Sequence, residues 1–205
     1  MKVFLLHGMG RTRASLLILR ARLAAGGLEP RLFGYSVARE SFDEIVARFV
    51  AMATEALRAS EPYALVGHSL GNVIARAALP RLPEGLERMV MLAPPNRPPR
   101  LASKLAANPL FSWLTGDAGQ RLASPDFYAS LPVPRVPVLV LAGTGGPRAA
   151  WLHGDEPTDG VVAVSETQLE GAEVVTVSAI HTLIMNDRAV ARATVDFLSV
   201  PRGLR

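Results

Sequence analysis

Short apolar segments alternate with amphipathic helical segments along this chain. Residues 3–6 and 63–66 are continuous apolar runs, typical of strands that are buried on both faces of a parallel sheet. The other elements predicted from periodicity and from Gly and Pro boundaries are strands at 31–35, 88–92, 136–141 and 173–177 and helices at 14–25, 42–59, 72–79 and 189–198. This order predicts an α/β fold, in which a mostly parallel central sheet of about six strands carries helices on both faces.

The size and composition of the chain predict one domain over residues 1–205. Of its 205 residues, 49% are hydrophobic, which is enough to form one sizeable core without help from disulfides or metals. No cysteine is present, so thiol catalysis, disulfides and thiolate metal sites are excluded. Any nucleophile is therefore a hydroxyl, a carboxylate or an amine.

The charge pattern gives no sign of a nucleic-acid partner. The net charge is +4 and the pI is near 10.1, but arginines and acidic residues are interspersed along the whole chain. The apolar run that begins at Val3 ends at His7, and no stretch reaches the roughly 20 apolar residues that a membrane span needs. We therefore expect a cytoplasmic protein without a membrane span, whose oligomeric state stays open.

The segment Gly67-His68-Ser69-Leu70-Gly71 fits the pattern G-x-S-x-G between a predicted strand and a predicted helix. In that setting the chain turns so tightly that the serine backbone is strained, and the flanking glycines keep neighbouring Cβ atoms away. The hydroxyl is then held above the sheet, near the positive end of the following helix. Ser69 is the predicted nucleophile.

A serine needs a base within hydrogen-bond reach, and the chain offers four histidines. His181 follows the last predicted strand, where the histidine enters when the order is Ser, Asp, His. We expect His7 to support its loop, His68 to pack or hydrogen-bond away from the hydroxyl, and His153 to be solvated in a loop rich in Gly and Pro. His181 is the predicted base.

The acid that orients the histidine is expected in the loop after the strand at 136–141. Asp159 is preferred, because Gly160 lets the backbone turn sharply and the apolar pair that follows anchors the loop on the core. Asp155 is the next candidate, and an ordinary turn aspartate is the other interpretation of position 159. Asp187 is interpreted as the cap of the final helix.

Acyl transfer also needs hydrogen-bond donors for the oxyanion of the tetrahedral intermediate. The backbone N–H of Leu70, directly after the predicted nucleophile, is one candidate. The turn His7-Gly8-Met9-Gly10 after the first strand is the second source, since glycines allow a close approach to substrate. The backbone N–H of Met9 is the predicted second donor.

Together these segments resemble the α/β-hydrolase superfamily, in particular small bacterial lipases and esterases with a His-Gly turn after the first strand and a G-H-S-x-G elbow. The resemblance covers nearly the whole chain. In that family the acid often lies in Asn-Asp-Gly, so Thr158 before Asp159 is a departure. The resemblance implies hydrolysis of a carboxylic ester through an acyl-enzyme, by a carboxylesterase or lipase that needs no metal and no organic cofactor.

The alternation of strands and helices breaks between residues 96 and 134, where a short cap of non-sheet structure is predicted. Its residues Leu110, Phe111 and Trp113 are candidates for an acyl-binding groove, although apolar residues at helical spacing are also consistent with simple packing. An apolar groove would fit a small ester with an apolar acyl group. An acyltransferase, a thioesterase or a non-catalytic binding module with the same fold are the alternatives that the residues leave open.

Overall fold

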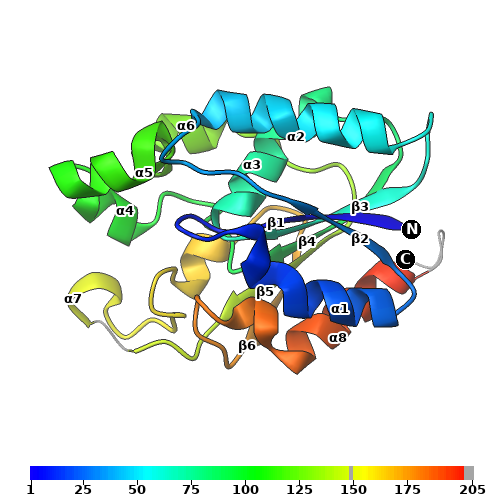
Figure 1. Cartoon of the computed structure of the whole chain (residues 1–205). Coiled ribbons are helices and arrows are strands. Elements are labelled where there is room, and N and C mark those ends of the chain that lie inside the picture. The colour runs from blue at the N-terminus through cyan, green and yellow to red at the C-terminus, as the bar shows by residue number, and fades with distance from the viewer. Residues whose placement is uncertain (148–149, 201–205) are drawn as a thin grey trace.

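A computed structural model of the chain shows one six-stranded sheet with every neighbouring pair of strands parallel, in the order β2-β1-β3-β4-β5-β6 (Figure 1). The structure describes residues 1–147 and 150–200, apart from the side chains of 109–112, 114, 150 and 151. The strands are β1 Lys2–Leu6, β2 Glu29–Phe33, β3 Tyr63–His68, β4 Leu86–Leu92, β5 Val138–Gly143 and β6 Glu173–Val177. The predicted α/β architecture is confirmed.

Helices cover both faces of the sheet, as Figure 1 shows. Helices α2 (Phe42–Ala56) and α3 (Leu70–Ala78) pack on one face, and α1 (Leu17–Ala25) and α8 (Arg188–Ser199) pack on the other. Alternate side chains of β1 supply both cores, with Phe4 and Leu6 on the α2 side and Val3 and Leu5 on the α1 side. The continuous apolar run of β1 follows from this burial, since successive side chains point to opposite faces.

Strand β2 begins two residues earlier than the sequence predicts, at Glu29 rather than Arg31. The predicted strand begins directly after Pro30, which has no N–H for a sheet hydrogen bond. In the structure β2 lies at the edge of the sheet and pairs only with β1, so the missing donor is tolerated. Tyr35, predicted to end this strand, instead stacks on the ring of His7 with a centroid distance of 4.1 Å.

Helix α2 starts where its sequence predicts and ends three residues early. Ser41 accepts from the backbone N–H of Glu44, and the Glu44 carboxylate accepts from the backbone N–H of Ser41, which forms a capping box. At the other end the Lys2 ammonium donates to the Ala56 carbonyl at 2.8 Å. The predicted last turn is lost because the chain must reverse there to enter β3.

The segment between β4 and β5 contains three helices and no strand, as the break in the sequence pattern predicts. They are α4 (Arg100–Leu105), α5 (Pro109–Leu122), which is kinked at Gly116, and α6 (Pro125–Ser130). The buried guanidinium of Arg76 in α3 donates to the carbonyls of Leu131 and Pro132, just after α6. This contact ties the helical segment to α3, which packs on the sheet.

None of the helices in the described part of the chain is both long enough and apolar enough to cross a bilayer.

Candidate active site

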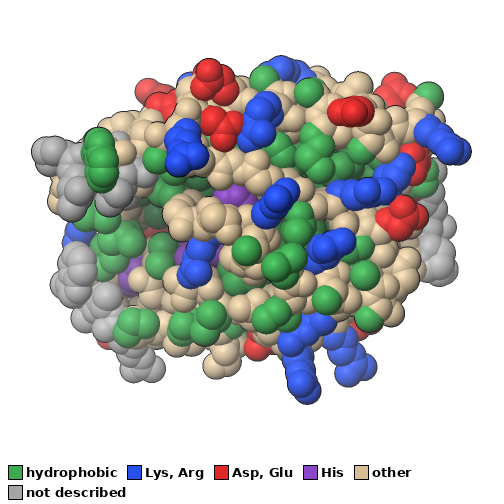
Figure 2. Space-filling view, in the orientation of Figure 1, with side chains coloured by type: hydrophobic (Ala, Val, Ile, Leu, Met, Phe, Trp, Pro, Cys, Tyr) green, Lys and Arg blue, Asp and Glu red, His purple; other side chains and the backbone are tan. Residues whose placement is uncertain are grey.

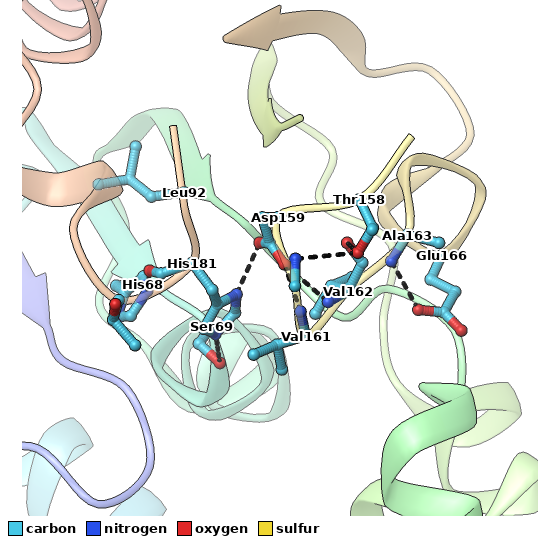
Figure 3. A network of polar contacts seen from close by, with 12 residues as sticks. His68, Ser69, Leu92, Thr158, Asp159, Val161, Val162, Ala163, Glu166 and His181 are labelled. Atoms are coloured by element: carbon cyan, nitrogen blue, oxygen red, sulfur yellow. Dashed lines mark hydrogen bonds and ion pairs between the residues drawn. The ribbon is translucent and has the colours of Figure 1, made fainter. Parts of the chain in front are cut away.

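Because all six strands are parallel, their carboxyl ends lie at the same edge of the sheet, and residues that follow β3, β5 and β6 meet there. The Ser69 hydroxyl, after β3, donates to Nε2 of His181, after β6, with an O···N distance of 3.0 Å. The Nδ1–H of the same imidazole donates to Oδ2 of Asp159, in the segment between β5 and β6, at 2.6 Å (Figure 3). Three side chains from distant parts of the chain therefore form one continuous line of hydrogen bonds.

Ser69 lies in a strained turn between β3 and α3. Its φ of 50° and ψ of −121° are unusual for a residue with a side chain. The flanking glycines are required by contact: a Cβ on Gly67 would lie 2.3 Å from Oδ1 of Asn72, and one on Gly71 would lie 2.4 Å from the Leu6 carbonyl oxygen. The Ser69 N–H donates to the Leu92 carbonyl at 3.0 Å, which anchors the turn to the end of β4.

The Asp159 carboxylate is 2% exposed and is held by backbone donors. Its Oδ1 accepts from the N–H groups of Val161, at 2.9 Å, and Val162, at 2.7 Å, which leaves Oδ2 for the imidazole. The alternative acid, Asp155, has an exposed side chain. Asp187 caps α8, as predicted, by accepting from the N–H groups at the start of that helix.

The ring of His68 points away from the Ser69 hydroxyl and supports the neighbouring histidine instead. Its Nε2–H donates to the backbone carbonyl of His181 at 3.0 Å, and the two rings lie 5.0 Å apart (Figure 3). Burial lowers the pKa of His68 well below its usual value, and the nearby His181 lowers it further. A neutral His68 therefore holds the backbone at position 181, which agrees with the packed, hydrogen-bonded role predicted for it.

His7 organises the loop after β1. Its Nδ1–H donates to the Gly8 carbonyl at 2.9 Å, its Nε2 accepts from the Tyr35 N–H at 3.3 Å, and burial lowers its pKa. The Gly8 carbonyl also accepts from the Arg11 N–H at 3.3 Å. Because N–H and C=O point in opposite directions across a trans peptide, the N–H of Met9 points away from these donors.

The loop after β1 and the start of α3 lie side by side. A Cβ on Gly8 would be 3.2 Å from the Ser69 Cβ, so the loop passes directly beside the serine. Leu70 is the first residue of α3, and the N–H groups of a first helical turn have no partner within the helix. The chain thus brings two backbone segments with donors to the neighbourhood of the Ser69 hydroxyl.

Two residues of the segment between β5 and β6 were not anticipated correctly from the sequence. His153, predicted to be solvated, is 3% exposed and ends α7 (Ala150–His153), which packs against α4; Gly and Pro nearby had suggested an open loop. Glu166 was not singled out, yet its carboxylate accepts from the N–H groups of Ala163 and Arg100, each at 2.8 Å. It joins the loop 158–163 that carries Asp159, here named the acid loop, to α4. No capping-box pattern marks Glu166 in the sequence, because Ala163 has no side-chain acceptor.

The predicted groove residues belong to α5. The indole of Trp113 is 75% exposed, and the side chains of Leu110 and Phe111 lie outside the described residues. Their substrate-binding role stays a prediction. Figure 2 shows histidine side chains recessed below the surface, from the middle of the view toward the side where α7 lies in Figure 1. Within the described residues, no group of three or more His, Asp or Glu side chains is arranged to hold a metal ion.

A family model described as the alpha/beta hydrolase family matches residues 3–202. The chain belongs to this family. The match spans both the serine turn and the region of His181, so the family assignment covers all the elements that build the site. A search of curated proteins finds no significant match to the chain.

Solved structures share the fold of this hydrolase-family chain at low sequence identity. A mature lipase from Bacillus licheniformis superposes with a TM-score of 0.73 at 16% identity, covering 97% of this chain and 92% of that one. A metagenomic carboxyl esterase superposes with a TM-score of 0.70 at 16% identity, covering 95% of this chain and 73% of that one. A monoacylglycerol lipase from Paleococcus ferrophilus superposes with a TM-score of 0.62 at 18% identity, covering 96% of this chain and 93% of that one. At these identities the likeness is one of fold.

Proposed function

We propose that this chain is a serine hydrolase that cleaves carboxylic esters through an acyl-enzyme. The observation that carries the proposal is the unbroken line of hydrogen bonds from the Ser69 hydroxyl through His181 to the buried carboxylate of Asp159. A serine hydroxyl is a poor nucleophile at neutral pH, and this arrangement removes its proton as it attacks. Structural likeness to lipases and an esterase is consistent with this chemistry and supports the ester class of substrate.

The reaction proceeds in two steps, acylation of Ser69 and then hydrolysis of the acyl-enzyme. The Ser69 oxygen attacks the ester carbonyl while its proton passes to Nε2 of His181, and Asp159 stabilises the imidazolium that forms. The tetrahedral intermediate then collapses, the ester C–O bond breaks, and the proton on His181 goes to the departing alcohol. Water next attacks the acyl-enzyme with His181 again as base, which releases the carboxylic acid and restores the serine.

The negative oxygen of the tetrahedral intermediate is stabilised by the backbone N–H groups of Met9 and Leu70. Each such donor lowers the barrier by about 3 kcal/mol in comparable hydrolases. Leu70 starts α3, so its N–H also carries the partial positive charge of the helix terminus. The Met9 N–H belongs to the same peptide as the Gly8 carbonyl. Because His7 and Arg11 donate to that carbonyl, the Met9 N–H points away from both of them.

The helical segment formed by α4, α5 and α6 is the proposed cap of the site, and an apolar acyl group is the proposed acyl half of the substrate. A series of p-nitrophenyl esters from acetate to palmitate measures the preferred chain length directly. Turnover in the presence of an added alcohol measures the partition between water and another acceptor. Hydrolysis predicts mainly the free acid, whereas mainly the new ester would identify an acyltransferase.

A fluorophosphonate probe tests the proposal itself. Wild type is expected to be labelled covalently, and Ser69→Ala is expected to lose both labelling and esterase activity, because the attacking oxygen is gone. Ser130→Ala is the matched control, since its exposed hydroxyl only donates to the Phe127 carbonyl. Absence of labelling in folded wild type, together with no turnover of any ester in the series, would overturn the proposal in favour of a binding module.

A further inference from the structure

The hydroxyl of Thr158, the residue before Asp159, makes two hydrogen bonds inside the acid loop. Its Oγ1 donates to the Val162 carbonyl at 3.1 Å and accepts from the Gly160 N–H at 3.0 Å (Figure 3). Thr158 is 2% exposed. The side chain is therefore committed to the loop and is shielded from water, which leaves the hydroxyl no alternative partner in solvent.

These two hydrogen bonds lie on either side of the peptides that donate to the Asp159 carboxylate. Oδ1 of Asp159 accepts from the N–H groups of Val161 and Val162, which belong to the two central peptides of the loop. Thr158 binds the two outer peptides, through the N–H of Gly160 on one side and the carbonyl of Val162 on the other. One hydroxyl thus holds both ends of the short stretch that presents donors to the acid.

The centre of the loop contains a glycine, whose own side chain adds no constraint on the backbone. Gly160 has a φ of +97°, a conformation that glycine reaches easily and also leaves easily. Backbone hydrogen bonds close the loop from the Asp159 N–H to the Val162 carbonyl at 3.2 Å and from the Val164 N–H to the Pro157 carbonyl at 3.0 Å, whereas the Gly160 N–H donates to the Thr158 hydroxyl. Movement of the Gly160 peptide would turn the donors of Val161 and Val162 away from Oδ1, and Oδ2 would then move relative to the imidazole Nδ1.

We propose that Thr158 is a positioning residue for the Asp159 carboxylate, acting through its hydroxyl rather than through its packing volume. The proposal rests on the proposed function, because it concerns the carboxylate that orients His181. Valine has nearly the shape of threonine but lacks the hydroxyl, and serine keeps the hydroxyl but lacks the methyl. The pair Thr158→Val and Thr158→Ser therefore separates hydrogen bonding from packing.

The test measures kcat and KM on the ester that wild type turns over fastest. For Thr158→Val we expect kcat to fall by roughly tenfold to a hundredfold with little change in KM, since a small misplacement of a positioning group is felt mainly in the chemical step. For Thr158→Ser we expect kcat within about threefold of wild type. The low-field proton resonance of the hydrogen bond between His181 Nδ1 and Asp159 is expected to shift or broaden in the valine variant alone.

Thr167→Val is the matched control. Thr167 is 1% exposed, lies in the same segment, and donates its hydroxyl to the Val164 carbonyl at 2.7 Å without touching Asp159. We expect it to lose thermal stability by an amount similar to that of Thr158→Val while keeping kcat and the low-field resonance. A loss of kcat in this control as large as in Thr158→Val would show that loop stability alone is being measured, and would overturn the proposal.

Two further results would also overturn it: a folded Thr158→Val with the kcat and resonance of wild type, or equal losses in the valine and serine variants. If Thr158→Val does not fold, Thr158→Ser and Thr158→Ala repeat the comparison, with activity expected for serine and lost for alanine; equal rates reject the proposal. Failure of the proposed function is distinguishable, because wild type would then turn over no ester in the series, or Ser69→Ala would keep the activity of wild type, whatever happens at position 158.

Discussion

The serine turn and the acid loop hold their functional oxygens in different ways. At Ser69 the side chain is aimed by its own backbone, which is forced into an unusual conformation where β1 and α3 leave no room for a Cβ on Gly71. At Asp159 the backbone also passes closely by Gly146, but the carboxylate itself is aimed by hydrogen bonds from Val161 and Val162. Crowding fixes one group, and polar contacts fix the other.

This difference predicts how each region fails. In a crowded backbone a substituent has no position that avoids a clash, so a substitution there lowers the free energy of unfolding first. A hydrogen-bonded carboxylate can lose its orientation while the fold persists, so the loss of that orientation lowers kcat first. Three experiments, in order of decreasing expected effect, test this contrast.

Asp159→Asn is expected to cause the largest loss, about 10⁴-fold in kcat, because the amide no longer stabilises the imidazolium and favours the wrong tautomer of His181. The substitution keeps the size of the side chain, so the thermal midpoint is expected to change little in comparison. Steady-state kinetics on a p-nitrophenyl ester measures the effect. Asp155→Asn is the control, because that carboxylate is exposed. Damage by Asp155→Asn together with a harmless Asp159→Asn would contradict the assignment of the acid.

Gly71→Ala and Gly160→Ala compare the cost of a steric clash in the serine turn with the cost of backbone strain in the acid loop, both in the free energy of unfolding. At Gly71 the new Cβ would meet the carbonyl oxygens of Leu6 and His7 at 2.4 and 2.7 Å, and we expect a loss of about 3 kcal/mol in the free energy of unfolding. At Gly160 the φ of +97° would strain alanine by about 1 to 2 kcal/mol. Urea denaturation measures both. A reversed ranking would show that the serine turn relaxes more readily than its contacts indicate.

His68→Gln is expected to give the smallest effect, visible in the pH dependence of stability. Because burial holds the pKa of His68 well below 6.5 in the folded chain, the unfolded chain binds a proton there that the folded chain does not. Stability is therefore complete above about pH 6.5 and falls as the pH drops toward the folded value, by at most about 1.4 kcal/mol per pH unit.

Glutamine at position 68 does not titrate, so the thermal midpoint should fall less steeply between pH 6.5 and 5 than it does in wild type. His7 has a lowered pKa as well, so part of the slope is expected to remain. The measurement is thermal unfolding followed by circular dichroism at a series of pH values. An unchanged slope would show that His68 does not contribute to acid sensitivity.

Much of the fold follows from the sequence pattern, and the errors in the sequence-based predictions have local causes. The buried strands β1 and β3 were predicted because a strand covered on both faces must be apolar throughout. Strand β2 was misplaced by two residues because the pattern does not reveal that Pro30 lies on an edge strand. His153 was predicted to be solvated because local Gly and Pro residues do not reveal that α4 covers α7.

By itself, the sequence determined the elements and the turn at Ser69, because strand burial, helix periodicity and the steric limits of a tight turn act over a few neighbouring residues. Only the tertiary structure decided that His181 and Asp159 reach that serine, that His68 donates to the backbone at 181, and that Thr158 binds both ends of the acid loop. These contacts join residues through space, and a hydrogen bond exists only when folding brings donor and acceptor to within about 3 Å of each other.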